Sequence, residues 1–205
     1  MNSITPITRA LLIANICGFV LQWAVGSQLL YSFALWPPGD GLYAPGFQPW
    51  QLITYAFLHG DFTHLLFNML ALYMFGSEVE RLLGARRYLV YYTACVIGAA
   101  LTQLALAWFG DGDAQPTIGA SGGVFGLLLA YGLAFPHRKL MLLFPPIPMP
   151  AWLFVTLYGV LELVLGVTRT QDGVAHFAHL GGMAAGFVLI LYWRRNPRGG
   201  AGKLR

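Results

Sequence analysis

The chain has 205 residues, of which 57% are hydrophobic and 10% are charged, and its formal net charge is +4. About 25% of the residues of a typical soluble domain are charged, so this composition excludes a soluble globular protein and indicates a membrane protein. The basic residues form short clusters between apolar runs, which argues against a nucleic-acid partner. Nor do we expect a metal or a cofactor, because Cys17 and Cys95 both lie in apolar runs, where buried thiols are ordinary.

Six apolar runs predict six helical spans, since a hydrocarbon core of about 30 Å needs about 20 residues per helix. The runs cover residues 7–27, 63–80, 88–109, 119–135, 151–167 and 175–193. The first could instead be a cleaved signal peptide, because Arg9 precedes it and small residues follow at 24–27, but its length favours a retained span. We therefore predict an all-α membrane protein. It forms one domain over 1–205, a six-transmembrane-helix bundle with a short central fourth helix, a core at 7–193 and a basic tail at 194–205.

Two connections between these runs are unusual. Residues 28–50 are rich in aromatic residues, proline and glycine and contain no lysine or arginine, so we expect this first loop to lie in the outer membrane interface. Residues 140–152, "LMLLFPPIPMPAW", are too often interrupted by proline to form a span and too apolar to be a solvated linker. We expect them to lie at the cytoplasmic interface.

The basic residues also predict the orientation, since cytoplasmic loops are enriched in lysine and arginine. On one side lie Arg9, Arg81, Arg86, Arg87, Arg138, Lys139 and the basic residues from Arg194 onward, and on the other lie Arg169, Asp40, Asp61, Asp111, Asp113 and Asp172. Both termini are then cytoplasmic and the number of spans is even. The absence of a transit-like leader favours a bacterial inner membrane.

Three polar residues inside the spans share one predicted depth. At a rise of 1.5 Å per residue, Ser121, His179 and His64 each lie about 21 to 22 Å from the cytoplasmic end of their own span. That level is roughly 8 to 10 Å below the outer edge of the hydrocarbon core. Polar side chains are costly there and indicate function, although a lone serine can bond its own helix and a lone histidine can serve packing.

The spacing of small residues predicts that two of these helices touch. His179, Gly182 and Gly186 lie on one face of their helix, and the small residues of "GASGG" at 119–123 suit the opposite side of a close contact. Ser121 would then reach His179, and Phe125, one turn further on, could stack on the imidazole. The alternative is a packing motif without chemistry.

The same residues suit acyl transfer. The amides near Ala120 and Ser121 stand at a helix start, where they are unpaired and can bind an oxyanion, while Ser121 attacks a carbonyl. His179 would take the serine proton and return it to the leaving amine. His64 and Asn68, at positions i and i+4, could supply further donors.

The motifs "HLLFN" at 64–68, "GASGG" at 119–123 and "AHLGG" at 178–182, in this order, resemble the rhomboid family of intramembrane serine proteases in its basic six-span form. The resemblance covers about residues 7–193. It implies that Ser121 and His179 form a catalytic dyad without an acid. It also implies an oxyanion hole of His64, Asn68 and the amides near Ala120, a turn shaped by Gly119, and a cap at 168–174. The implied partners are the lipid bilayer and, as substrates, single-span or other membrane proteins. The sequence makes no prediction about the oligomeric state.

Several residues have more than one reading. Family members often carry Trp-Arg where this chain has Trp50 and Gln51, so the resemblance does not imply a salt bridge there. His176 is the rival to His179 as the base, and we favour His179 for its motif and depth. His59 could gate the site or be a simple interfacial histidine. Glu162, in the outer half of the fifth span, could be a protonated structural carboxyl, or it could orient His179 or line a water path.

At the cytoplasmic end, Glu78 and Glu80 precede Arg81, and we expect local ion pairs between them. At the outer end, we expect Asp61, Thr63, His59 and the connection with Asp111, Asp113 and Gln115 to line the mouth of a water-filled cavity.

Two other functions compete with proteolysis. One is an inactive relative that binds membrane clients, which would have no need to keep the serine, both histidines and Asn68 together. The other is a proton channel or transporter built on His64, His179 and Glu162. The chain shows no internal repeat and its polar residues stop at one level, so a continuous path lacks support.

Overall fold

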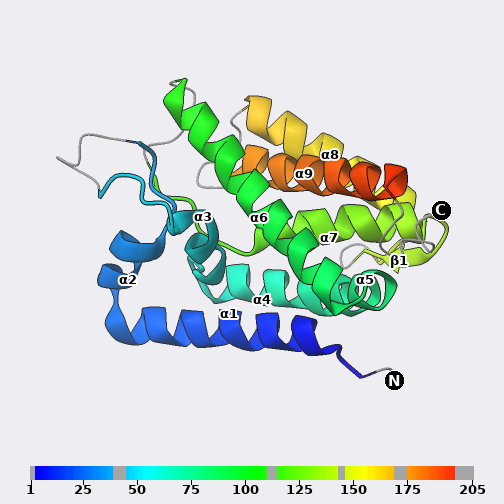
Figure 1. Cartoon of the computed structure of the whole chain (residues 1–205), viewed down its shortest axis with the longest axis horizontal. Coiled ribbons are helices and arrows are strands. Elements are labelled where there is room, and N and C mark those ends of the chain that lie inside the picture. The colour runs from blue at the N-terminus through cyan, green and yellow to red at the C-terminus, as the bar shows by residue number, and fades with distance from the viewer. Residues whose placement is uncertain (1–2, 39–44, 110–114, 143–145, 169–174, 197–205) are drawn as a thin grey trace.

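The computed structural model describes residues 3–38, 45–109, 115–142, 146–168 and 175–196. Helices form most of it and lie side by side as a bundle (Figure 1). The longer helices are α1 (Pro6–Val25), α4 (Phe62–Ala71), α6 (Ala85–Trp108), α7 (Ser121–Ala134), α8 (Ala151–Thr168) and α9 (His176–Arg195). The shorter elements are α2 (Ser27–Phe33), α3 (Gln51–Thr54), a 3₁₀ turn η1 (Tyr55–Phe57), a π-helical turn η2 (Leu72–Gly76), α5 (Ser77–Leu83), β1 (Lys139–Met141) and β2 (Pro148–Pro150).

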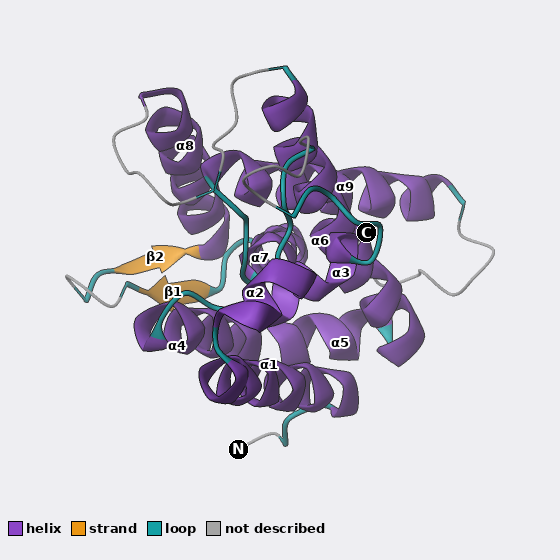
Figure 2. Ribbon diagram, turned by 90° about the vertical axis from the view of Figure 1, so that its left-hand side faces the viewer, coloured by secondary structure: helices purple, strands orange, loops and turns teal. Residues whose placement is uncertain are grey.

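Helix α7 lies in the middle of the bundle, where it contacts α4, α5, α6, α8 and α9 (Figure 2). Most of its residues are therefore buried, including Gly122, Leu127 and Ala130. Its 14 residues correspond to a length of about 21 Å, which is shorter than a hydrocarbon core of about 30 Å. A helix of this length can begin inside the membrane rather than at its surface, and Ser121 is its first residue.

The composition and the exposed surface agree on the environment of the bundle. Within the described ranges, four helices, α1, α6, α8 and α9, are long and apolar enough to cross a membrane. The outer helices expose large apolar side chains, such as Trp23 on α1 and Val160 and Val164 on α8. A soluble protein does not tolerate such a surface, whereas lipid tails cover it without cost. The prediction of an integral membrane protein is confirmed.

The second predicted span, at 63–80, differs from a continuous helix. Its residues form α4, the π-helical turn η2 and α5 in succession. Gly76 lies at the close approach to α1 and α6, because a Cβ added there would stand 2.8 Å from the Tyr88 hydroxyl and 2.9 Å from a methyl carbon of Thr8. A π turn holds an additional residue, so it changes which face of the helix meets these neighbours.

Both unusual connections contain regular structure that the sequence did not predict. The first loop includes α2 at Ser27–Phe33, separated from α1 only by Gly26 with its positive φ of 77°. In the second connection β1 and β2 pair as a short antiparallel ribbon, a local exception in a fold that is otherwise helical, as expected. The ribbon tolerates Pro148 and Pro150 because each strand has one unpaired edge, where a missing N–H costs nothing.

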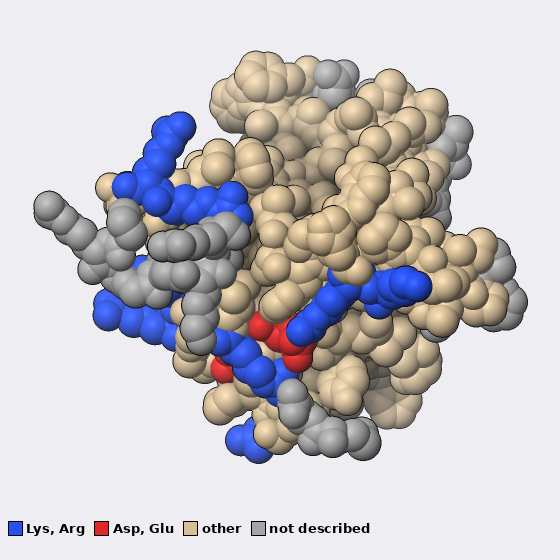
Figure 3. Space-filling view, turned by 90° about the vertical axis from the view of Figure 1, so that its right-hand side faces the viewer, with Lys and Arg blue, Asp and Glu red and all other residues tan. Residues whose placement is uncertain are grey.

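Lysine and arginine side chains gather at the end of the bundle where α1 begins and α9 ends, around a small group of acidic side chains (Figures 1 and 3). Glu78 pairs there with Arg81 at 2.8 Å, as expected, and with Arg138 at 2.9 Å. This end corresponds to the side predicted to be cytoplasmic. The basic tail beyond residue 196 lies outside the described residues.

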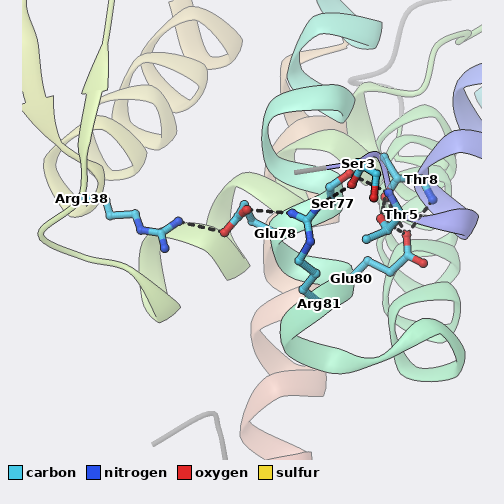
Figure 4. A network of polar contacts seen from close by, with 8 residues as sticks. All are labelled: Ser3, Thr5, Thr8, Ser77, Glu78, Glu80, Arg81 and Arg138. Carbon is cyan, nitrogen blue, oxygen red and sulfur yellow. Dashed lines mark hydrogen bonds and ion pairs between the residues drawn. The ribbon is translucent and has the colours of Figure 1, made fainter. Parts of the chain in front are cut away.

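Glu80 departs from the expected ion pair with Arg81. Its carboxylate instead accepts the backbone N–H groups of Ile7 at 3.0 Å and Thr8 at 2.8 Å. It also accepts the hydroxyls of Thr5 and Thr8 (Figure 4). These amides belong to the first turn of α1, which has no intrahelical acceptor for them and carries a positive partial charge. A carboxylate from α5 thus caps α1 and ties the first helix to the bundle.

Candidate active site

Ser121 is held in place by the turn that precedes α7. Gly119 has a φ of +122°, a conformation that only glycine adopts without strain, and its N–H donates to the Tyr55 carbonyl at 2.9 Å. A Cβ at Gly119 would stand 2.7 Å from Nε2 of His64 and 3.7 Å from Oγ of Ser121. Glycine at 119 therefore allows the chain to turn into α7 and leaves room between these two side chains.

His179 lies opposite Ser121, with its Nε2 2.8 Å from the serine Oγ. The contact depends on the close approach of α7 and α9, where a Cβ added to Gly182 would collide with the carbonyl of Gly122. One turn further along the same face of α9, a Cβ at Gly186 would collide with the Tyr91 hydroxyl. The small residues thus permit the spacing that brings serine and histidine together.

Phe125 fixes the orientation of the imidazole. Its ring is stacked on that of His179, with a distance of 4.3 Å between the ring centroids and an angle of 7° between the planes. Phe125 follows Ser121 by one helical turn, so both side chains lie on the same face of α7. The ring of His179 can rotate only at the cost of this stacking contact.

The other imidazole nitrogen of His179 faces a carboxylate. Its Nδ1 lies 2.8 Å from Oε2 of Glu162 on α8, and Nδ1 of His176 lies 2.7 Å from the same oxygen. All three residues are buried. Among the described residues, Glu162, His176 and His179 form a group that could bind a metal ion. Here, however, both imidazole nitrogens contact the carboxylate oxygen directly, at hydrogen-bonding distance. Sequence reasoning treated Glu162 and His176 separately and missed that they meet.

The expected oxyanion donors lie on α4. The Gly60 N–H approaches Nδ1 of His64 at 3.4 Å, so Nε2 is the nitrogen left to carry the ring proton, and it points toward Gly119. Asn68 is buried and its amide donates to the His64 carbonyl at 3.1 Å, which engages one of its two N–H groups within its own helix. Asp61 caps α4 by accepting the His64 N–H at 2.8 Å.

His59 does not lie at the surface. Its side chain is fully buried and its ring meets that of His64 edge to face, with 5.0 Å between the ring centroids. Burial, together with the neighbouring His64, lowers the pKa of His59 to about 4, although Asp61 raises it in part. His59 therefore packs against His64 as an uncharged ring at neutral pH. Neither ring nitrogen has a partner among the described residues.

The loop before α3 is held by Gln51, at the position where family members often carry an arginine. Gln51 is fully buried, and its side-chain oxygen accepts the backbone N–H groups of Trp36 and Gln48, at 3.2 and 3.1 Å. Leu35 and Thr117 exchange two backbone hydrogen bonds, which join the first loop to the segment that enters α7. Of the expected cap at 168–174, only Thr168, the last residue of α8, is described; residues 169–174 and the acidic residues of 110–114 lie outside the described residues.

These features define a helical membrane protein in which a serine and a histidine meet at the start of a central, buried helix. The family model of the rhomboid domain, a comparison of sequences, matches residues 46–196 of this chain. The chain belongs to the rhomboid family.

Three relatives illustrate the range of similarity. "Rhomboid protein 1, mitochondrial" of Saccharomyces cerevisiae is 34% identical over 69% of this chain and 41% of its own length. "Rhomboid protease GluP" of Bacillus subtilis is 31% identical over 67% of this chain and 25% of its own length. "Rhomboid protease GlpG" of Yersinia pestis is 24% identical over 93% of this chain and 64% of its own length. The chain therefore spans less than two thirds of the length of each of these relatives.

Proposed function

We propose that this protein is an intramembrane serine endopeptidase that hydrolyses peptide bonds in or near transmembrane segments of other membrane proteins. The observation that carries the proposal is the distance of 2.8 Å between Oγ of Ser121 and Nε2 of His179. It is supported by membership of a family in which the relatives from Bacillus subtilis and Yersinia pestis are named proteases.

In the proposed reaction, Ser121 attacks the carbonyl carbon of the scissile bond while its proton moves to Nε2 of His179. The negative charge that develops on the carbonyl oxygen is stabilised by the amides at the start of α7 and by the Nε2–H of His64. His179 then gives its proton to the leaving amine. Water, activated by the same imidazole, hydrolyses the acyl-enzyme and restores the serine.

A helical substrate must unwind locally to reach this serine, because a hydrogen-bonded backbone shields its carbonyl groups. We expect cleavage where small or helix-weakening residues reduce the cost of unwinding.

The proposed topology has six spans, which adds the interrupted α4–η2–α5 segment and the short α7 to the four long apolar helices. Both termini are placed in the cytoplasm, at the basic end of the bundle, and the site opens toward the opposite side. A bacterial inner membrane stays a prediction, since the relatives include mitochondrial as well as bacterial proteins.

The test is cleavage of a single-span reporter protein by the purified protein in detergent. Ser121→Ala is expected to be folded and inactive. Ser27→Ala is the matched control, because Ser27 is also the first residue of a helix but lies on α2, far along the chain from the site. Cleavage by the Ser121→Ala variant at the normal rate would end the proposal. A wild-type protein that binds the reporter without cleaving it would identify an inactive client-binding protein, and proton flux in vesicles without cleavage would identify a channel.

A further inference from the structure

Glu162 is a buried carboxylate on a helix whose other long side chains are mostly exposed. The buried residues of α8 are Ala151, Val155 and Glu162, whereas its large apolar side chains are mostly exposed. A carboxyl group at this depth is costly unless hydrogen-bond donors satisfy it. Its position on the inner face of α8 therefore needs partners, and both described partners come from α9.

The two partners are imidazoles that approach the same oxygen. Nδ1 of His176 and Nδ1 of His179 lie 2.7 and 2.8 Å from Oε2 of Glu162, and the two rings are nearly perpendicular, at 89°. An ionised carboxylate can only accept hydrogen bonds, so both Nδ1 atoms then carry the ring proton. This tautomer leaves the Nε2 of His179 as an acceptor, directed at the hydroxyl of Ser121.

His176 is placed to hold the carboxylate rather than to act on the serine. Its ring makes no described contact with Ser121, and its Nε2 has no partner among the described residues. A protonated Glu162 would have to donate its hydroxyl to one of the two Nδ1 atoms. If that nitrogen belonged to His179, a neutral ring would carry its proton on Nε2 and could not accept one from Ser121.

We propose that Glu162 is a positioning residue that extends the serine–histidine pair to a relay of Ser121, His179 and Glu162, with His176 bracing the carboxylate. This inference rests on the proposed protease function. In the relay, the proton of Ser121 moves to Nε2 of His179 as the bond from Oγ to the substrate carbon forms. The resulting imidazolium is stabilised by the adjacent carboxylate, which itself stays unprotonated, and the proton leaves with the amine. The chain thus supplies an acid that the resemblance to the family does not imply.

A carboxamide at position 162 separates positioning from packing, because glutamine keeps the size of glutamate but loses the charge. For Glu162→Gln we expect kcat for the reporter to fall by about 10²- to 10⁴-fold, with KM changed by less than about threefold. Glu162→Asp should recover part of the activity. His176→Phe should lower kcat less than Glu162→Gln does, because the bond between Glu162 and His179 survives.

The matched control is Thr156→Val, since Thr156 is exposed on the same helix and, among the described residues, its hydroxyl donates to the Trp152 carbonyl one turn earlier in α8. It should cleave like the wild type, and thermal unfolding in detergent should show that all variants are folded. A folded Glu162→Gln variant with the kcat of the wild type would overturn the relay, whatever Ser121→Ala shows. Loss of wild-type activity on chelation, restored by zinc, would overturn it in favour of a metal site.

A second readout does not depend on cleavage. In protein labelled with ¹⁵N-histidine, the wild-type His179 is expected to carry its proton on Nδ1, and Glu162→Gln should redistribute the proton between the two nitrogens. An unchanged His179 signal in that variant would refute the relay. If the wild type fails to cleave any reporter, the protease proposal fails, and this spectrum still decides whether Glu162 controls the imidazole.

Discussion

The contact of α7 with α9 at Gly182 offers the sharpest test of how the site is assembled. In Gly182→Ala, the added methyl carbon would lie 2.8 Å from the carbonyl carbon of Gly122 and 3.1 Å from its Cα, and closer still to its carbonyl oxygen. These neighbours are backbone atoms, which cannot turn aside as a flexible side chain can. The helices must therefore separate by something on the order of 1 Å to reach ordinary van der Waals distances of about 3.5 to 4 Å.

This separation acts directly on the site, because His179 is one turn from Gly182 on the same face of α9. The distance of 2.8 Å between Nε2 and Oγ would then exceed hydrogen-bonding range. A misplacement of about 1 Å can cost about 10²-fold in rate, and overpacking costs about 1 to 3 kcal/mol in the free energy of unfolding. We expect Gly182→Ala to lose about 10²-fold in kcat and to unfold at a lower temperature.

The assay is reporter cleavage together with thermal unfolding in detergent. Gly159→Ala is the matched control, since a Cβ at Gly159 on α8 would meet only the Met183 side chain, at 3.6 Å. That variant should keep its activity and its stability. A Gly182→Ala variant with wild-type kcat would show that the approach of α7 and α9 does not set the geometry of Ser121 and His179.

Two further predictions concern the ends of the bundle. Glu80→Gln should lower the free energy of unfolding by about 1 to 3 kcal/mol, since a charged acceptor of two α1 amides is lost, whereas Glu78→Gln at the surface should cost less than about 1 kcal/mol. Denaturation in detergent measures both, and equal effects would refute the capping role. The low pKa of His59, about 4 against an ordinary 6.5, means that the unfolded chain binds this proton first as the pH falls. Stability should therefore drop by up to about 3 kcal/mol between pH 6.5 and pH 4, and His59→Phe should reduce this drop; an unchanged pH dependence in that variant would contradict the assignment.

The sequence predicts the longest helices well because length and hydropathy are sufficient for them. The runs at 88–109 and 151–167 agree with α6 and α8 to within a few residues. The interruption of the second span was not predictable from hydropathy, since the π turn at Leu72–Gly76 is as apolar as α4, which precedes it. Gly76 packs there against Thr8 and Tyr88 on other helices, and hydropathy does not reveal contacts of this kind.

In the candidate site, too, some contacts could be predicted from the sequence and others could not. The small residues at 119–123 and at Gly182 were a local signal for the approach of α7 to α9. Glu162 stands out in the apolar sequence of α8, and orienting His179 was one of its expected roles, but no local signal showed that His176 would share its carboxylate oxygen. Likewise, the preference of Glu80 for the first turn of α1 over the nearby Arg81 depends on a contact across 72 residues.

The central claim is that Ser121 is a nucleophile activated by His179. Mass spectrometry of the purified protein after reaction with a fluorophosphonate tests it most directly, since the adduct identifies the activated serine. We predict a single adduct on Ser121 that is lost in His179→Ala and that still forms, more slowly, in His176→Ala. An adduct on a different serine, or labelling that survives the loss of His179 but not of His176, would contradict the account.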